Sequence, residues 1–375
     1  MIVLINLFKI FMNFIYFFIK LFPTKNKITM ISRESNSEVL DFRLLREEIE
    51  RRNDFQVVVL CKKLEGNFFN KIGYLFHMFK QMYHIATSKI VVLDTYCICI
   101  SILKHKKSLK VVQIWHSMGT MKKFGYSAMG LEEGRSEKVS NLMNMHKNYD
   151  YIFASSEAYK DHLAKGFNYD EKYIYTFPLP RYDLLISKEY DKECKKKIYS
   201  KYKRLKKKEN ILYCPTFRKN NNSLENALKE LIDAVDYSKY NLIIKLHPLD
   251  ETYIDIDNDS VIFDTTFSTS DMLCVSDYVI SDYSCVIYEA SVKNIPIHFY
   301  NYDYDEYETR RGLAIDYYKE LPGVISSSPR EIINGIKYTE KDMEKLVKFS
   351  NKYVKPTKSA TGDIVEFLYN IAYNK

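Results

Sequence analysis

The feature that most constrains the fold is a series of short apolar runs that alternate with segments of helical periodicity. The run Tyr278–Ile280 is broken by the polar residues 281–284, and apolar residues then recur at helical spacing from Cys285 to Lys293. This pattern predicts a buried parallel strand, a tight turn and a helix. Similar runs predict strands at 27–32, 57–60, 90–93, 111–115, 151–154, 211–214, 241–246 and 261–263. Strands that alternate with helices predict a doubly wound α/β fold with parallel sheets.

The length and the apolar content allow two domains. A chain of 375 residues with 46% hydrophobic residues can build two cores of ordinary size. A basic stretch at 191–208 separates two αβ series, either as a solvated helix or as a linker, with contact to anionic lipid as the functional alternative. We expect two Rossmann-like domains with a cleft between them. The predicted parts are a membrane-associating helix at 1–23, a first domain at 27–188, a basic linker at 189–209 and a second domain at 210–375.

Charge and cysteine usage narrow the class of ligand. The formal net charge of +8 suits anionic ligands or an anionic membrane face, and it does not by itself indicate nucleic acid. Seven cysteines without a CxxC pair favour a reducing compartment and give no sign of structural zinc. Asp303 and Asp305 form a DxD pair in an acidic, Tyr-rich loop, where a surface role is more common than metal binding. We therefore predict no metal and no cofactor.

Residues 2–22 are apolar and aromatic, and their polar interruptions Asn6, Lys9, Asn13 and Lys20 fall on one helical stripe. No positive charge precedes the apolar core and no cleavage site follows it, so a signal peptide is not expected. A spanning helix would place Lys9 and Asn13 in mid-membrane at a cost of a few kcal/mol. We therefore favour a helix in the membrane interface with its polar stripe outward, over a true span or a buried domain helix.

Polar residues follow several predicted strands. In doubly wound sheets, ligands gather beyond the carboxyl ends of the strands. His116 stands at such an end in the first series, and His247 stands at one in the second. Ser284 precedes the predicted helix at 285–293, where free N–H groups and the helix dipole favour phosphate, although an ordinary Ser cap is the simpler interpretation.

Five segments in order resemble the CDP-glycerol glycerophosphotransferase family of teichoic acid synthesis. They read QIWHSMGTMKKFGYS (113–127), FPLPRYDLL (177–185), LYCPTFR (212–218), LIIKLHP (242–248) and ISDYSCVIYEA (280–290). The resemblance covers roughly residues 28–350 and implies a GT-B fold of two Rossmann-like domains. It also implies a peripheral protein on the cytoplasmic side of the cell membrane, which agrees with the apolar N-terminal segment.

The resemblance also assigns site residues by position. It implies that His116 is catalytic, and that the donor CDP-glycerol is contacted elsewhere along the motifs. The implied substrate-binding residues are Trp115, Ser117, Gly119, Arg181, Pro215, Thr216, Arg218, Lys245, Leu246, His247, Asp282, Ser284, Cys285 and Glu289. The chain departs from the family pattern at three of them: Ser117 replaces a common Gly, Cys285 replaces a Ser, and Glu289 replaces an Asp.

The chemistry of this transfer fits the residue types. A hydroxyl must attack the distal phosphorus of CDP-glycerol while CMP leaves, and a base at the acceptor oxygen contributes about 10²–10⁴-fold. His titrates in the right range for that base, while cations and N–H or O–H donors stabilise the phosphoryl charge. Arg181, Lys245, His247 and Thr216 are the predicted groups, and Arg218 pairs either with phosphate or with a surface carboxylate.

We therefore expect a glycerophosphotransferase whose acceptor is a lipid-linked saccharide or a growing polyol-phosphate chain. CDP-ribitol is the alternative donor, because Glu289 is one methylene longer than the family Asp. Two rival functions are a GT-B glycosyltransferase that uses a nucleotide sugar and a non-catalytic nucleotide-binding membrane scaffold. The length of the chain favours an enzyme that adds one or a few units over one that polymerises many. Residues 126–147 are expected to form a mobile loop that covers the acceptor or is only a surface excursion.

Overall fold

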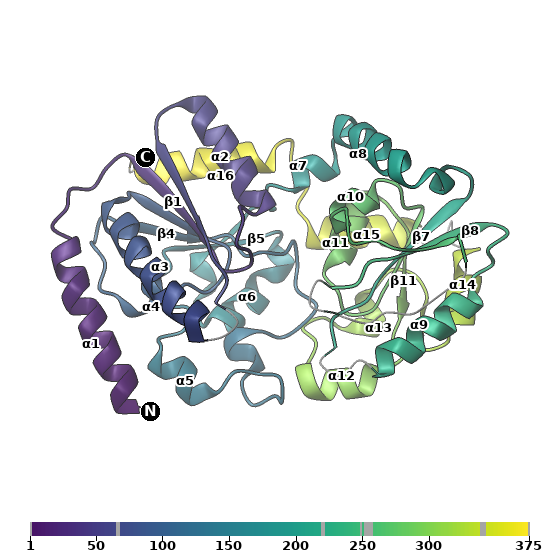
Figure 1. Cartoon of the computed structure of the whole chain (residues 1–375), viewed down its shortest axis with the longest axis horizontal. Coiled ribbons are helices and arrows are strands. Elements are labelled where there is room, and N and C mark those ends of the chain that lie inside the picture. The colour runs from purple at the N-terminus through teal and green to yellow at the C-terminus, as the bar shows by residue number, and fades with distance from the viewer. Residues whose placement is uncertain are drawn as a thin grey trace. The chain divides into compact units, whose positions relative to one another are not determined.

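The computed structural model describes residues 2–64, 68–218, 222–247, 250, 258–337 and 343–373. The chain divides into two compact units, each with one six-stranded sheet whose strand pairs are all parallel. Unit 1 comprises Met1–Met118, Phe124–Asp183 and Lys355–Lys375, and unit 2 comprises Gly119–Lys123 and Leu184–Val354. The two predicted αβ series are therefore confirmed as two parallel-sheet units (Figure 1).

The sheet of unit 1 brings the ends of β3 and β4 together. Its strands are β1 (Lys27–Ser32), β2 (Gln56–Cys61), β3 (Ile90–Leu93), β4 (Lys110–Gln113), β5 (Tyr151–Ala154) and β6 (Ile174–Thr176), in the order β2-β1-β3-β4-β5-β6. Leu93 lies opposite Gln113 in the register of β3 and β4. Asp94 and His116, which follow these two strands, therefore meet at one edge of the sheet.

Helices flank this sheet. They are α1 (Ile2–Ile19), α2 (Leu40–Arg52), α3 (Phe68–Thr87), α4 (Ile98–Ile102), α5 (Glu137–Leu142), α6 (Lys160–Phe167) and α16 (Ala360–Ala372), with 3-10 turns η1 (Gly125–Ala128), η2 (Glu157–Tyr159) and η3 (Glu171–Tyr173). The short α7 (Tyr182–Leu185) lies where the chain passes from unit 1 to unit 2. The segment predicted as a loop at 126–147 thus holds most of η1 and all of α5.

The C-terminal helix α16 belongs to unit 1, whereas the sequence assigned residues up to 375 to the second domain. The Asp183 carboxylate accepts hydrogen bonds from the N–H groups of Ala360 (2.7 Å) and Thr361 (2.9 Å), which lie in the first turn of α16. The apolar face of α16, with Ile364 and Leu368, is buried. A capped N-terminus and a buried stripe hold the helix in unit 1, and the predicted boundary is corrected accordingly.

Unit 2 places three motif segments at one edge of its own sheet. Its strands are β7 (Glu209–Cys214), β8 (Tyr240–Ile244), β9 (Val261–Phe263), β10 (Tyr278–Ser281), β11 (Ile297–Tyr300) and β12 (Ile325–Ser326), in the order β12-β11-β10-β7-β8-β9. Because β10, β7 and β8 are adjacent and parallel, the segments 215–218, 245–247 and 282–285 follow neighbouring strand ends. Strands β11 and β12 were not predicted from the sequence.

The helices of unit 2 include the predicted basic linker. They are α8 (Lys188–Lys201), α9 (Asn222–Ala234), α10 (Thr269–Leu273), α11 (Val286–Val292), α12 (Tyr304–Arg311), α13 (Tyr317–Glu320), α14 (Pro329–Ile336) and α15 (Met343–Tyr353), with the 3-10 turn η4 (Lys203–Lys206). The stretch 189–209 is therefore mostly the helix α8 rather than a linker. Cys194 and Ile198, spaced by four residues, are buried and fix α8 to unit 2.

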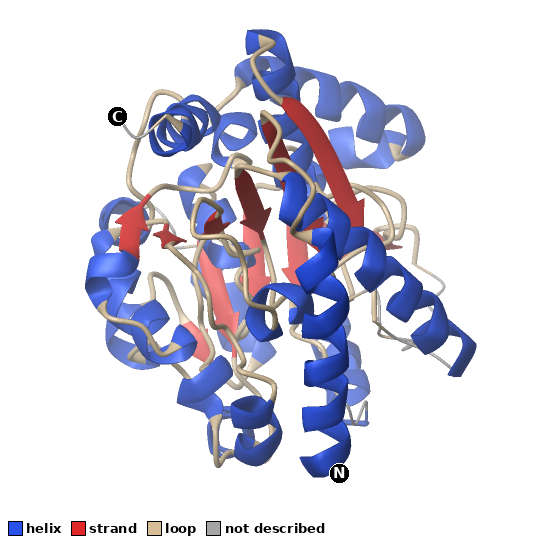
Figure 2. Ribbon diagram, turned by 90° about the vertical axis from the view of Figure 1, so that its left-hand side faces the viewer, coloured by secondary structure: helices blue, strands red, loops and turns tan. Residues whose placement is uncertain are grey.

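Helix α1 runs along the outside of unit 1 (Figures 1 and 2). The hydrogen bonds of its polar stripe point towards the rest of unit 1, which corrects the predicted outward orientation. Lys9 Nζ donates to the carbonyl oxygen of Leu142 (2.8 Å), and Asn13 Nδ2 donates to that of Ile102 (2.9 Å). These carbonyls belong to the last residues of α5 and α4, where a helix leaves its carbonyl oxygens without partners. The stripe therefore caps two helix ends, and the apolar side of α1 is left exposed. By length and composition, α1 could cross a membrane.

Candidate active site

In unit 1, His116 lies just beyond β4 and is oriented by its neighbours. Its Nδ1 lies 3.3 Å from the backbone carbonyl oxygen of Asp94. A carbonyl oxygen can only accept, so Nδ1 carries the proton and Nε2 has its lone pair available. The ring of Trp115 lies 4.1 Å away, centre to centre. Trp115 itself has a φ of 66°, which breaks the strand and turns the chain at this point.

The electrostatic surroundings keep His116 neutral. Burial lowers the pKa of His116 below its ordinary value, and the charge of Arg181 lowers it further, against opposing effects of Glu34 and Asp41. A neutral imidazole with a free Nε2 can accept a proton near neutral pH. The geometry and the protonation state therefore both suit a general base.

Arg181, predicted to contact the donor, is paired with Asp41 in unit 1. Its Nε donates to Asp41 Oδ2 (3.0 Å), and its backbone N–H donates to Asp41 Oδ1 (2.9 Å). Its Nη2 lies 3.4 Å from the carbonyl oxygen of His116. Arg181 thus braces the segment that carries His116, while its contact with a donor stays a prediction. Asp41 was missed, because nothing in the sequence marks an acid on α2 as the partner of a residue 140 positions away.

In unit 2, the fully buried Asp282 organises the ends of β7 and β10. Its carboxylate accepts from the N–H (2.9 Å) and the hydroxyl (2.8 Å) of Thr216. It also forms an ion pair with Arg218 Nη2 at 2.8 Å. Asp282 and Thr216, both predicted to contact the donor, therefore bind each other, and with the buried Pro215 they shape the turn after β7.

Arg218 joins Asp282 to the predicted DxD pair. Its Nε donates to Asp303 Oδ2 at 2.6 Å, and its guanidinium lies 4.9 Å from the ring centre of Tyr307. Arg218 is thus paired with two carboxylates, the buried Asp282 and the half-buried Asp303, while its contact with a phosphate stays a prediction. Asp303 is thereby occupied by an arginine. Within the described residues, no group of three or more His, Cys, Asp or Glu side chains could hold a metal ion.

The motif after β8 supplies one structural lysine and one exposed histidine. Lys245 Nζ donates to Asp264 Oδ2 (2.9 Å) and to the backbone oxygens of Asp264 and Phe267. Leu246 packs against the core of unit 2. His247 is exposed, with its ring 5.5 Å from that of Phe217, and Pro248 lies outside the described residues. Among the described residues of this motif, His247 is the most exposed.

Three further predicted residues of unit 2 lie beyond β10, two in the turn before α11 and one on α11 itself. Ser284 and Cys285 are half-buried at the start of α11. Glu289 is buried on the same helix, and its Oε2 accepts from Ser270 Oγ at 2.9 Å. Elsewhere, Gly119 is buried in the segment 119–123 of unit 2, and Ser117 is half-buried in unit 1.

Sequence reasoning missed Lys122, which faces the same turn from the segment 119–123. This segment pairs with unit 2 through an antiparallel bridge between Lys122 and Leu313. Burial lowers the pKa of Lys122 to about 8, against the opposing effects of Cys285 and Asp282. Within the described part of the chain, no carboxylate forms an ion pair with Lys122. The sequence offered only its position inside the first motif as a signal.

The two parallel-sheet units define a GT-B-type α/β protein, and comparison with known proteins identifies the family. The family CDP-glycerol:poly(glycerophosphate) glycerophosphotransferase matches residues 13–368. The chain therefore belongs to this family of transferases.

Two relatives match along most of their length. The teichoic acid ribitol-phosphate primase of Bacillus spizizenii is 29% identical, over 89% of this chain and 88% of that protein. The teichoic acid glycerol-phosphate primase of Bacillus subtilis is 28% identical, over 98% of each. Among solved structures, the wall teichoic acid polymerase TagF aligns with a TM-score of 0.75 at 20% identity, over 94% of this chain and 90% of that chain. That last likeness confirms the fold.

Proposed function

We propose that this protein transfers glycerol phosphate from CDP-glycerol to a hydroxyl of a teichoic-acid-type acceptor and releases CMP. The observation that carries the proposal is His116 beyond the end of β4, with Nδ1 against the Asp94 carbonyl and a lowered pKa. In the proposed reaction, His116 Nε2 takes the proton of the acceptor hydroxyl. The acceptor oxygen forms a bond to the distal phosphorus, and the bond from that phosphorus to the bridging oxygen breaks, so that CMP leaves with the electron pair.

Unit 2 is the proposed donor-binding unit. The diphosphate of CDP-glycerol requires cations and hydrogen-bond donors in fixed positions. We assign these roles to Lys122, to the Ser284–Cys285 turn and to His247. We assign a supporting role, without direct donor contact, to Asp282, Arg218 and Lys245. Their charges are already paired with protein groups.

The alcohol carried by the donor is a separate question, since relatives named for glycerol phosphate and for ribitol phosphate match this chain to similar degrees. We favour glycerol because the matching family is described by CDP-glycerol. Glu289, the residue that raised ribitol as an alternative, is hydrogen-bonded to Ser270 inside unit 2.

We further propose that the protein is attached peripherally to the cytoplasmic side of the cell membrane through α1. Phe14 and Phe17 of this helix are 63% and 59% exposed, whereas its polar stripe is bound to unit 1. Exposed apolar side chains along one whole helix face are costly in water and fit the membrane interface.

The test is an assay of the purified full chain with CDP-glycerol, CDP-ribitol and a lipid-linked disaccharide, followed by mass measurement of the products. CMP release with a mass increase of glycerol phosphate on the acceptor is the expected result. A mass increase of ribitol phosphate on the acceptor would instead identify CDP-ribitol as the donor. Transfer of a sugar with release of UDP or GDP, or binding without any donor turnover, would contradict it.

A further inference from the structure

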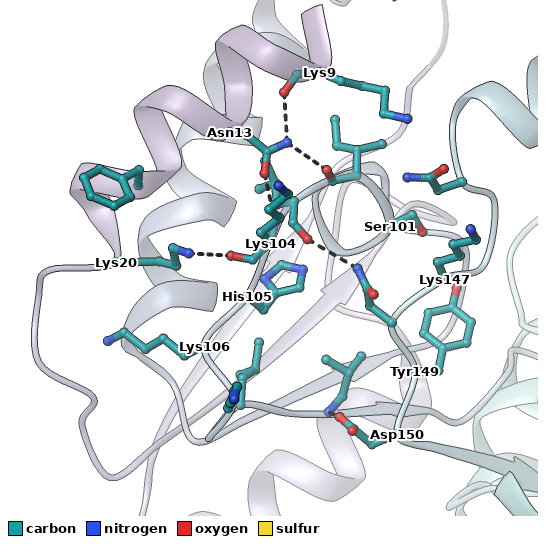
Figure 3. Close-up of a pocket in the computed structure, with 18 of the residues that line it drawn as sticks. Lys9, Asn13, Lys20, Ser101, Lys104, His105, Lys106, Lys147, Tyr149 and Asp150 are labelled. Atoms are coloured by element: carbon teal, nitrogen blue, oxygen red, sulfur yellow. Dashed lines mark hydrogen bonds between the residues drawn. The ribbon is translucent and has the colours of Figure 1, made fainter. Parts of the chain in front are cut away.

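A basic pocket lies between α1 and the body of unit 1 (Figure 3). Its volume is about 920 Å³. Its walls come from one face of α1, from the segment after α4 and from the segment before β5. Six lysines line it: Lys9, Lys20, Lys104, Lys106, Lys107 and Lys147. The single carboxylate in the lining, Asp150, already accepts the N–H of Val111 at 2.8 Å.

Three of the six lysines hold the pocket together. Lys9 and Lys20 of α1 donate to the carbonyl oxygens of Leu142 (2.8 Å) and Lys104 (2.7 Å). Lys106 donates in the opposite direction, to the carbonyl oxygen of Phe22 at 2.6 Å. None of these contacts neutralises a charge, because each acceptor is a backbone oxygen.

The other three lysines are exposed and face the solvent of the pocket. Among the described residues, the ammonium groups of Lys104, Lys107 and Lys147 have neither an ion pair nor a hydrogen bond, and all three residues are exposed. Burial lowers the pKa of the neighbouring Lys106, and repulsion by the charge of Lys20 lowers it further. A bound anionic group would relieve that repulsion.

The rim of the pocket adds a second kind of chemistry. Ile10, Phe14 and Phe17 of α1 line the pocket and are 67%, 63% and 59% exposed. A water-soluble anion gains nothing from such a rim, whereas acyl chains beside α1 would be buried against it. Cations below an apolar rim match the order of groups in a membrane lipid.

The pocket is remote from the proposed reaction. Leu109, Val111 and Asp150 of its lining stand at the amino ends of β4 and β5, whereas His116 follows the carboxyl end of β4. At about 3.3 Å per strand residue, β4 and its flanks separate the two places by on the order of 15 Å. A group bound in this pocket would therefore hold and orient unit 1 and would not take part in the reaction.

We propose that this pocket binds the phosphate headgroup of an anionic phospholipid from the bilayer in which α1 lies. This inference rests on the proposed membrane attachment and adds to it a discrete lipid site with named lysines. It is independent of donor chemistry, because neither His116 nor any residue assigned to the donor lines the pocket.

The test uses the full chain and a short-chain lipid below its micelle concentration, so that no charged surface is present. Dihexanoyl phosphatidylglycerol is titrated calorimetrically into the wild type and into two triple variants. The pocket variant is Lys104→Gln, Lys107→Gln and Lys147→Gln, which leaves the lysines that bond α1 intact. The control is Lys195→Gln, Lys196→Gln and Lys197→Gln, which removes the same charge from exposed positions of α8 in unit 2.

We expect saturable binding of one phosphatidylglycerol, at least about tenfold tighter than dihexanoyl phosphatidylcholine. Since each lysine near an anionic lipid contributes about fivefold, the pocket variant should lose on the order of a hundredfold, and the control should stay within about twofold. Equal losses of affinity in both variants, or equal binding of the two lipids, would overturn the proposed lipid site. Such a result would indicate non-specific electrostatic attraction instead. Lys107→Gln alone, with an expected loss of about fivefold, replaces the triple variant if the latter unfolds on heating at a lower temperature.

Two further ligands separate the sources of phosphate. Inorganic phosphate that binds as tightly as phosphatidylglycerol would show a soluble-anion site and overturn the lipid assignment. Farnesyl diphosphate that binds more tightly would replace the phospholipid by an isoprenoid carrier. CMP release in detergent should be unchanged in the pocket variant, so the lipid site and the proposed transferase activity fail or succeed separately.

Discussion

If Lys122 binds the donor as proposed, donor affinity has a pH dependence whose sign and size follow from the pKa of Lys122. In the free protein, burial lowers the pKa of Lys122 to about 8. If its ammonium group binds the donor diphosphate, the bound anion must raise that pKa again, because the charged form gains a partner. Binding then takes up one proton wherever the free lysine is neutral. The sign is therefore fixed: donor affinity is constant below about pH 8 and falls above it.

The size of the change in donor affinity follows from the uptake of one proton on binding. With a free pKa of about 8, the donor Kd should rise about tenfold between pH 7 and pH 9, or about 1.4 kcal/mol. Lys122→Arg should keep donor binding and abolish this slope, because a guanidinium stays charged throughout the range. Lys122→Met should bind weakly at every pH, since it removes the charge altogether.

The assay is calorimetric titration of CDP-glycerol across this pH range in buffers of different ionisation enthalpy, which counts the protons taken up. Cys285 is the matched control, because it lies close enough to Lys122 to act on its charge. Cys285→Ser should leave the slope unchanged. A slope that survives Lys122→Arg, or one that vanishes in Cys285→Ser, would refute the assignment of the diphosphate to Lys122.

Three other outcomes follow from the contacts. Asp282→Asn should lower the free energy of unfolding, measured with denaturant, by about 3 kcal/mol or more, because it leaves Arg218 with one carboxylate fewer. Asp305→Asn, at an exposed position, is the control, and equal stability of the two variants would argue against the network. Arg181→Ala should reduce turnover more than donor affinity, since Arg181 braces the His116 segment; a loss confined to affinity would place it on the donor. Deletion of residues 1–22 should move the protein from the membrane to the soluble fraction and keep donor hydrolysis, and retention in the membrane would shift the attachment elsewhere.

Much of the fold can be predicted because buried strands appear as short apolar runs in the local sequence. The predicted strand at 27–32 coincides with β1, and that at 90–93 coincides with β3. The strand predicted to end at Trp115 stops at Gln113, since the left-handed conformation of Trp115 cannot be inferred from an apolar side chain. Strand β11 has the same apolar character and was overlooked.

The parts that failed depend on partners distant in sequence. The periodicity of α1 reveals its polar stripe. No local pattern shows that the stripe donates hydrogen bonds to carbonyl oxygens at the ends of α4 and α5. As cations at strand ends, Lys245 is predicted to contact phosphate, and Arg218 to pair with either phosphate or a surface carboxylate. Their actual partners include Asp282 and Asp264, which one sequence does not pair with them.

The most direct test of the central claim is the turnover of His116→Ala with CDP-glycerol and a lipid-linked acceptor, measured alongside the Kd of the donor. A base acts in the transition state and contributes little to donor binding, so turnover should fall by about 10²–10⁴-fold while the Kd stays within a few-fold of the wild type. Turnover within a few-fold of the wild type would contradict the account.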